Sequence, residues 1–198
     1  MTKEEFKKKW ENYWYHYKSR TWVIIFVIAA LCYTVFEFVS TKVDDIVITY
    51  IGKYANYAGI AEEIETNFGD VLEDVSGNKT IKVSAANILA TSNAFEGDMV
   101  FWQRIDINFL NGQSYLYFVD EPIYKYLSGR NLLGKIKTAE GEVDFIDVTE
   151  NEYFSKYVYN NEKLYLCVRG EFAETPDKKI VMLEENSKKV LKKILENN

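Results

Sequence analysis

The sequence predicts an α/β domain, with a mainly parallel sheet and helices on its faces, preceded by a single transmembrane helix. Near the N-terminus, one apolar run is long enough to cross a bilayer. After it, strand-like segments alternate with amphipathic helical segments, an order typical of a parallel sheet covered by helices. The length beyond the apolar run, about 150 residues, allows one compact domain and excludes a second.

The apolar run, Trp22 to Val39, has 18 residues and a single charge, Glu37. At 1.5 Å per residue it spans about 27 Å, close to the hydrocarbon thickness of a bilayer, and continuation to Val43 supplies the remainder. A buried core helix would carry a polar stripe, whereas this run has no polar residue before Thr34. We therefore predict a transmembrane helix over residues 22–43. Near its outer end, Glu37 either contacts a partner helix or reaches the headgroups.

The charges are distributed unevenly along the chain. Residues 1–21 carry six basic and three acidic side chains, or +3, whereas the chain after Val39 has 18 basic and 26 acidic side chains, or −8. By the positive-inside rule, residues 1–21 form a cytoplasmic basic and aromatic segment, and residues 44–198 form an extracytoplasmic domain at the cell membrane. Four aromatic residues before the run share one helical face and predict a short interfacial helix: Trp10, Tyr13, Trp14 and Tyr17.

The sequence favours an uncleaved signal-anchor over a processed N-terminus. Phe36 to Thr41 offers no Ala-x-Ala pattern for signal peptide cleavage, and Leu31 precedes Cys32, where a lipoprotein signal needs a small residue. Because Cys32 lies in the apolar run and Cys167 in the domain, we expect no intramolecular disulfide. A domain without disulfides is compatible with a bacterial surface, where a full-size core stabilises the fold.

The first half of the domain is predicted to alternate strand and helix. Asp44 to Gly52 is a β-branched run closed by glycine and is typical of a strand. Apolar residues at helical spacing over residues 60–75 predict an amphipathic helix, and Thr80 to Ala85 predicts the next strand. A second helix is expected over Met99 to Phe109, before an apolar strand at Tyr115 to Asp120.

The second half is predicted to continue this alternation. Pro122 opens a short helix that Gly129 closes. Strands are expected at Val143 to Thr149 and Lys163 to Arg169. The chain ends in an amphipathic helix with an apolar side made of Val190, Leu191, Ile194 and Leu195.

Several kinds of chemistry are excluded by what the chain lacks. The only histidine, His16, lies in the predicted cytoplasmic segment, so the domain has no Ser-His-Asp arrangement and no histidine-ligated metal site. There is no Walker loop, Cys-x-x-Cys, Gly-x-Gly-x-x-Gly or Gly-x-Ser-x-Gly motif. Cys167 is expected to be a small buried hydrophobe. We therefore expect no enzyme activity, cofactor or metal, and the acidic domain argues against nucleic acid.

Tyr115 to Lys137, YLYFVDEPIYKYLSGRNLLGKIK, resembles the first lobe of extracellular solute-binding proteins of bacterial ABC transporters. In that family a buried strand ends in an acidic residue, a short helix follows with a tyrosine and a leucine, and a glycine-leucine turn leads to Pro-Leu-Asp. Lys163 to Gly170 resembles the return strand of that fold, and the N-terminal stretch is similar to small single-pass membrane proteins of Gram-positive bacteria. Gly134-Lys135-Ile136 replaces Pro-Leu-Asp. The family's order is followed by Asp120, Tyr126, Leu127, Gly129 and Leu132.

The resemblance implies a binding role for one edge of the domain. About 150 residues build one lobe, so the family's two-lobed clamp is absent, and a ligand edge remains at the carboxyl ends of the strands. By position, its residues are Tyr50, Tyr54, Asn87 and Asp120, and the alternative is that these are ordinary strand-end and loop residues.

The function implied is that of a non-enzymatic, membrane-anchored binding or accessory module that works with an ABC-type transporter. Its expected partners are the lipid bilayer, a small-molecule ligand, and a membrane protein or a second copy of the chain. The alternative is a cell-envelope structural or sensory protein that acts through protein–protein contacts.

Overall fold

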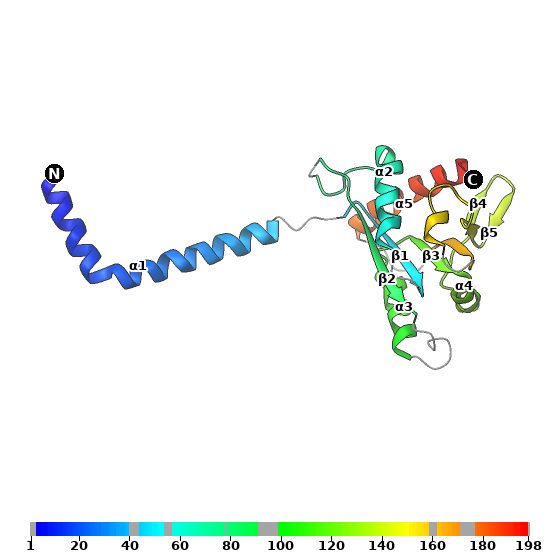
Figure 1. Ribbon diagram of the computed structural model, residues 1–198, viewed down its shortest axis with the longest axis horizontal. Helices are drawn as coiled ribbons and strands as arrows, with labels where there is room; N and C mark the ends of the chain where they lie inside the picture. The colour runs from blue at the N-terminus through cyan, green and yellow to red at the C-terminus, as the bar shows by residue number, and fades with distance from the viewer. Residues whose placement is uncertain are drawn as a thin grey trace. The chain divides into compact units, whose positions relative to one another are not determined.

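The computed structural model describes residues 3–39, 44–53, 57–77, 79–90, 99–158, 162–170 and 177–197. The chain divides into two compact units, Met1–Lys42 and Val43–Asn198. The first unit holds α1 (Lys3–Val39), a helix of 37 residues. The second unit holds the strands and the other helices of the described residues, and it forms the α/β domain (Figure 1).

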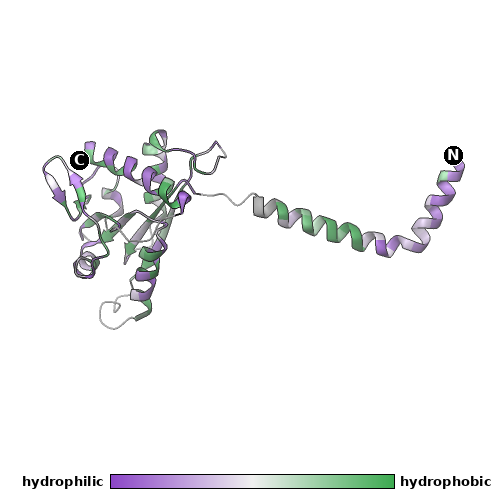
Figure 2. Ribbon diagram, turned by 180° about the vertical axis from the view of Figure 1, so that it is seen from behind, coloured by the Kyte–Doolittle hydropathy of each residue, from purple (hydrophilic) through white to green (hydrophobic). Residues whose placement is uncertain are grey.

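Helix α1 is the one helix among the described residues that is long and apolar enough to cross a membrane. None of its apolar window is buried, and Phe26 is 76% exposed. A core helix of a soluble protein would bury such side chains. Hydrophobic residues occupy the second part of α1, after a polar first part (Figure 2). The helix is compatible with a single-pass membrane protein.

The centre of the domain is a mixed five-stranded sheet with the order β2-β1-β3-β7-β6. The α/β class is confirmed, but the sheet is not simply parallel: β1 pairs in parallel with β2 and β3, whereas β7 is antiparallel to β3 and β6. Because β7 is apolar throughout, its sequence does not distinguish a parallel from an antiparallel neighbour. The strands are β1 (Ile46–Gly52), β2 (Val83–Leu89), β3 (Leu116–Asp120), β6 (Ile146–Asp147) and β7 (Leu164–Val168).

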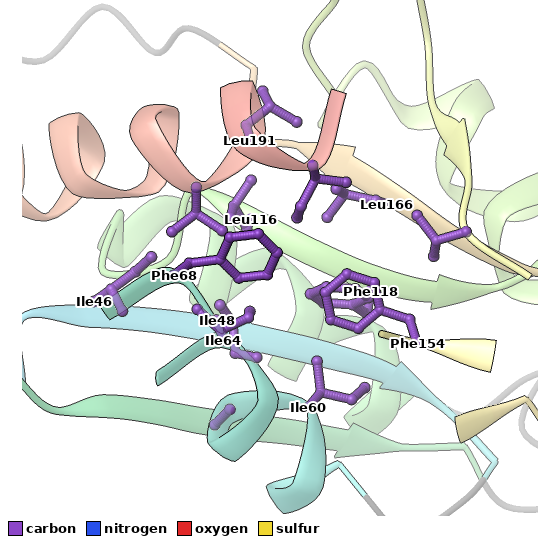
Figure 3. Packing of buried hydrophobic residues seen from close by; sticks show 14 of the residues in the cluster. Ile46, Ile48, Ile60, Ile64, Phe68, Leu116, Phe118, Phe154, Leu166 and Leu191 are labelled. Carbon is purple, nitrogen blue, oxygen red and sulfur yellow. The ribbon is translucent and has the colours of Figure 1, made fainter. Parts of the chain in front are cut away.

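Helices cover both faces of this sheet. On one face, α2 (Ala58–Phe68) and α5 (Lys178–Glu196) pack over a cluster that includes Ile48, Leu116 and Phe118. In Figure 3, Phe68 of α2 lies among these side chains and Leu191 of α5 lies above them. On the other face, α3 (Met99–Asn111) and α4 (Glu121–Leu127) pack over a second cluster.

The structure differs from the predicted elements in four places. The helix predicted over residues 60–75 ends at Phe68, and only a 3-10 turn at residues 69–71 follows it. The predicted strand at residues 80–85 is β2, three residues later. Of the predicted strand at residues 143–149, Val143 ends another strand and only Ile146–Asp147 forms β6. A separate hairpin of β4 (Ile136–Thr138) and β5 (Gly141–Val143) was not predicted. Short 3-10 helices complete the domain: η1 (Gly69–Val71), η2 (Ser128–Arg130) and η3 (Ser155–Tyr157).

Two buried polar side chains fix the chain that leads into β2. The Asp45 carboxylate accepts hydrogen bonds from three backbone N–H groups in residues 75–82, at 2.7 to 3.1 Å. The amide of Asn186, on α5, donates to the carbonyls of Asp45 and Glu73, at 2.9 and 2.8 Å. Since buried polar groups are costly unless they are hydrogen-bonded, this network holds α5, β1 and the loop before β2 together.

Candidate functional site

The carboxyl ends of β1 and β3 carry a buried hydrogen-bonded pair, Tyr50 and Asp120. The Tyr50 hydroxyl lies 3.0 Å from both carboxylate oxygens of Asp120 and donates to them. The backbone N–H of Lys53 donates to Oδ2 of Asp120 at 2.9 Å. Tyr50 is 4% and Asp120 5% exposed. Both oxygens of the carboxylate therefore already have hydrogen-bond donors inside the domain.

Gly52 allows this pair to form. A Cβ atom at Gly52 would lie 2.0 Å from the Tyr50 hydroxyl oxygen and 2.5 Å from Oδ2 of Asp120. Such distances are far below van der Waals contact, so any larger residue would separate the tyrosine from the carboxylate. The glycine that closes the predicted first strand thus has a packing role.

Charged side chains lie beside this pair. Nζ of Lys53 is 3.3 Å from Oε1 of Glu162. Burial raises the pKa of the Asp120 carboxyl above its ordinary value, and the negative charge of Glu162 raises it further. The hydrogen bonds from the Lys53 N–H and the Tyr50 hydroxyl oppose this rise in pKa. The protonated form of Asp120 is therefore favoured relative to a carboxyl in water.

The structure brings together three of the four predicted edge residues. Asn87 of β2 lies directly across from Tyr50 in the parallel register, so the two side chains share the face on which Asp120 also lies. Tyr54 falls outside the described residues. The helical backbone at Glu37 is described, whereas its side chain is not.

Sequence reasoning missed Lys53 and Glu162 at this edge. They are 109 positions apart, and nothing in the local pattern of either segment indicates that they meet. Chemically, the cluster offers one buried carboxyl with a raised pKa. In the parts of the chain that the structure describes, no group of three His, Cys, Asp or Glu side chains could hold a metal ion. A ligand role for the edge stays a prediction.

A second candidate site lies at the free edge of the sheet. β2 ends the strand order, and no other described strand pairs with its outer side (Figure 1). Its sequence, VSAANIL, has no charge and no proline over seven residues. Ala90 N–H donates to the Gly52 carbonyl at 2.8 Å, so the even-numbered residues direct their backbone groups toward β1 and the odd-numbered ones outward. The outward N–H of Val83 donates to Oε2 of Glu65 at 3.1 Å.

Exposed apolar side chains of α3 flank this edge. Helix α3 contacts β2, and its Trp102 and Asp106 face Tyr126 and Arg130, which lie on the α4 side. The opposite side of α3 therefore faces away from α4, toward the free edge. Two strongly exposed apolar side chains of α3 lie on the side away from α4: Val100 (57%) and Ile107 (56%). Met99 (71% exposed) and Leu110 (68%) fall nearer to Asp106, on the α4 side of the helix.

The fold thus defines a class of protein in which an α/β domain is joined to a long apolar helix. The sheet of this domain ends in an uncharged edge strand of seven residues. No family model, curated protein or solved structure matches the chain.

Proposed function

We propose that this chain is a non-enzymatic, membrane-anchored binding module whose α/β domain binds a partner protein at the outer edge of β2. The observation that carries the proposal is the uncharged seven-residue edge beside the exposed apolar side chains of α3. Sheet edges of this length are normally protected by charges, proline or bulges, because free backbone groups otherwise pair with other chains. Exposed apolar side chains beside such an edge are typical of a binding surface.

The partner that fits is an extended segment that adds a strand to β2. Successive side chains of such a strand point to opposite faces of the sheet. On one face they would meet Glu62 and Glu65 of α2, both exposed, and on the other the apolar side chains Val100 and Ile107 of α3. The surface therefore favours a segment in which basic and apolar residues alternate.

Two observations support the link to a membrane transport partner. The apolar helix α1 is compatible with a place in the membrane beside such a partner. The segment that resembles the return strand of solute-binding lobes is β7, which pairs with β3, the strand of the other segment that carries the resemblance. The role as an accessory module of an ABC-type transporter rests on that resemblance, whereas binding at the β2 edge rests on geometry.

A small-molecule ligand at the Tyr50 edge is the second candidate. It is supported by the meeting of Tyr50, Asn87 and Asp120 at the carboxyl ends of parallel strands. The Tyr50 hydroxyl already donates a hydrogen bond to the Asp120 carboxylate. A ligand would therefore have to displace this hydroxyl or bind over Lys53 and Glu162.

Site-specific crosslinking of the full chain in its native membrane tests the main proposal. A photo-crosslinking residue at Leu89, the exposed end of β2, is expected to capture one defined partner. Ile107→Lys should abolish this crosslink, because a charge replaces an exposed apolar contact beside the edge. Met182→Lys is the matched control, since Met182 is an exposed apolar residue on α5, on the other face of the sheet.

The partner's identity separates the alternatives. A crosslink to a transporter subunit supports the accessory role, and a crosslink to a second copy supports the structural alternative. A crosslink that survives Ile107→Lys, or the absence of any crosslink from Leu89, would overturn binding at this edge.

A further inference from the structure

The first part of α1 has an exposed aromatic face. Phe6, Trp10, Tyr13 and Tyr17 recur at the spacing of one helix face, and Trp10 is 55% exposed. Neighbouring rings stack: Trp10 lies 6.1 Å from Tyr13 and 6.0 Å from Trp14, and Tyr13 lies 5.4 Å from Tyr17 between centroids. The result is a continuous aromatic surface along the helix.

Basic side chains border this aromatic face on both sides. At about 100° per residue, Lys7 and Lys18 fall on one flank, and Lys9 and Arg20 fall on the other. Of the acidic residues in the same segment, Glu4 and Glu11 fall farther round the helix, whereas Glu5 lies about as far from the aromatic face as Lys18. The net charge of +3 on residues 1–21 is thus concentrated around the aromatic side chains.

Helix α1 bends between its aromatic first part and its apolar second part (Figure 1). Oγ1 of Thr21 donates to the carbonyl of Tyr17 at 2.9 Å, and this bond to the preceding turn is a known cause of helix bending. The hollow at the bend is lined by Ser19, Arg20, Val23 and Ile24. A bent helix can cross a bilayer with one part while the other part lies along the surface.

We propose that residues 3–21 form a membrane-surface arm that lies in the headgroup region and binds anionic phospholipids. Aromatic rings insert at the boundary between headgroups and acyl chains, and flanking lysines reach from there to the phosphates. Each basic side chain near an anionic surface strengthens binding about fivefold. This proposal depends on α1 crossing the membrane, and it does not depend on what binds the β2 edge.

Hydrogen exchange of the full chain in lipid nanodiscs tests this arm. The amides of residues 3–17 should exchange about tenfold more slowly in discs with phosphatidylglycerol than in discs of phosphatidylcholine alone, because a free helix of this length frays in water. High salt should reduce the difference, since it screens surface charges. The amides of α5 serve as an internal reference that the lipid should leave unchanged.

Matched lysine variants give the test its specificity. Lys9→Gln, on the flank of the aromatic face, should lower the lipid-dependent protection about fivefold. Lys8→Gln removes the same charge from the opposite side of the helix and should leave the protection nearly unchanged. Equal protection in both lipids, equal effects of the two variants, or an arm that exchanges freely in both discs would each overturn the proposal.

Discussion

At the scale of single residues, the pair of Tyr50 and Asp120 holds two strands together and also contains a carboxyl with a raised pKa. Both side chains are buried, and the hydrogen bond between them joins the ends of β1 and β3. A buried carboxyl that ionises loses solvation, which the Lys53 N–H and the Tyr50 hydroxyl offset only in part. The pair therefore makes the stability of the domain depend on pH.

Asp120→Asn should remove this pH dependence. Because the folded state raises the pKa of Asp120 above its ordinary 3.8, the wild-type domain loses stability as pH rises from 3.8 through the raised value. Asparagine keeps an acceptor for the Lys53 N–H and has no charge to bury. Relative to wild type, the variant's free energy of unfolding should thus grow with pH across that interval and level off above it.

Urea unfolding at a series of pH values measures this difference. The contributions of carboxyls with a lowered pKa, such as Glu63 and Asp147, run the opposite way but are present in both proteins and cancel in the comparison. A difference between the two proteins that is constant from pH 3 to 8 would show that Asp120 ionises in the fold as readily as in water.

At the scale of elements, the register of β2 makes its two alanines unequal. The backbone N–H of Ala86 points toward β1 and that of Ala85 points outward, by the alternation that Ala90 fixes. Ala86→Pro should therefore destabilise the domain by about 2 kcal/mol or more, since it removes a bond of the ladder and leaves a carbonyl of β1 without its donor. Ala85→Pro should cost about 1 kcal/mol or less, as proline is tolerated at outward edge positions. Thermal unfolding of both variants checks this, and equal losses would mean that the outer edge of β2 is paired.

The elements that the sequence predicted well are those with strong apolar periodicity. Helix α3 and strand β3 lie within two residues of their predicted ranges, because their apolar side chains repeat at a clear spacing. Strand β2 was predicted too early, since Ala85, Ala86 and Asn87 have weak strand preference and are held by pairing with β1. The direction of β7 depends on contacts with β3, which no local pattern encodes.

The same limit applies to the candidate site. Tyr50 and Asp120 were predicted together because the carboxyl ends of neighbouring parallel strands meet. The direct hydrogen bond between them engages the carboxylate inside the domain. It depends on the absence of a side chain at Gly52, and the strand positions alone do not predict it. Glu162 comes from a distant segment of the chain and reaches this site by its ion pair with Lys53.

At the scale of the whole molecule, the charge asymmetry along the chain predicts its orientation. Residues 1–21 carry a net charge of +3, and the chain after Val39 carries −8, on either side of the apolar part of α1. Basic residues next to a membrane-spanning helix are retained on the cytoplasmic side. The N-terminal arm is therefore expected inside the cell and the α/β domain outside.

Cysteine labelling of intact cells tests this orientation. A maleimide that cannot cross the membrane should label Ser128→Cys, an exposed position after α4, and should leave Ser19→Cys unlabelled until the cells are lysed. The wild-type chain serves as the background: Cys167 is fully buried, and burial raises the pKa of its thiol, so it reacts poorly. Cys32 lies in the apolar part of α1, which a bilayer is expected to shield from a polar reagent. Labelling of Ser19→Cys in intact cells would reverse the orientation and place the β2 edge in the cytoplasm, where its partner would then have to be sought.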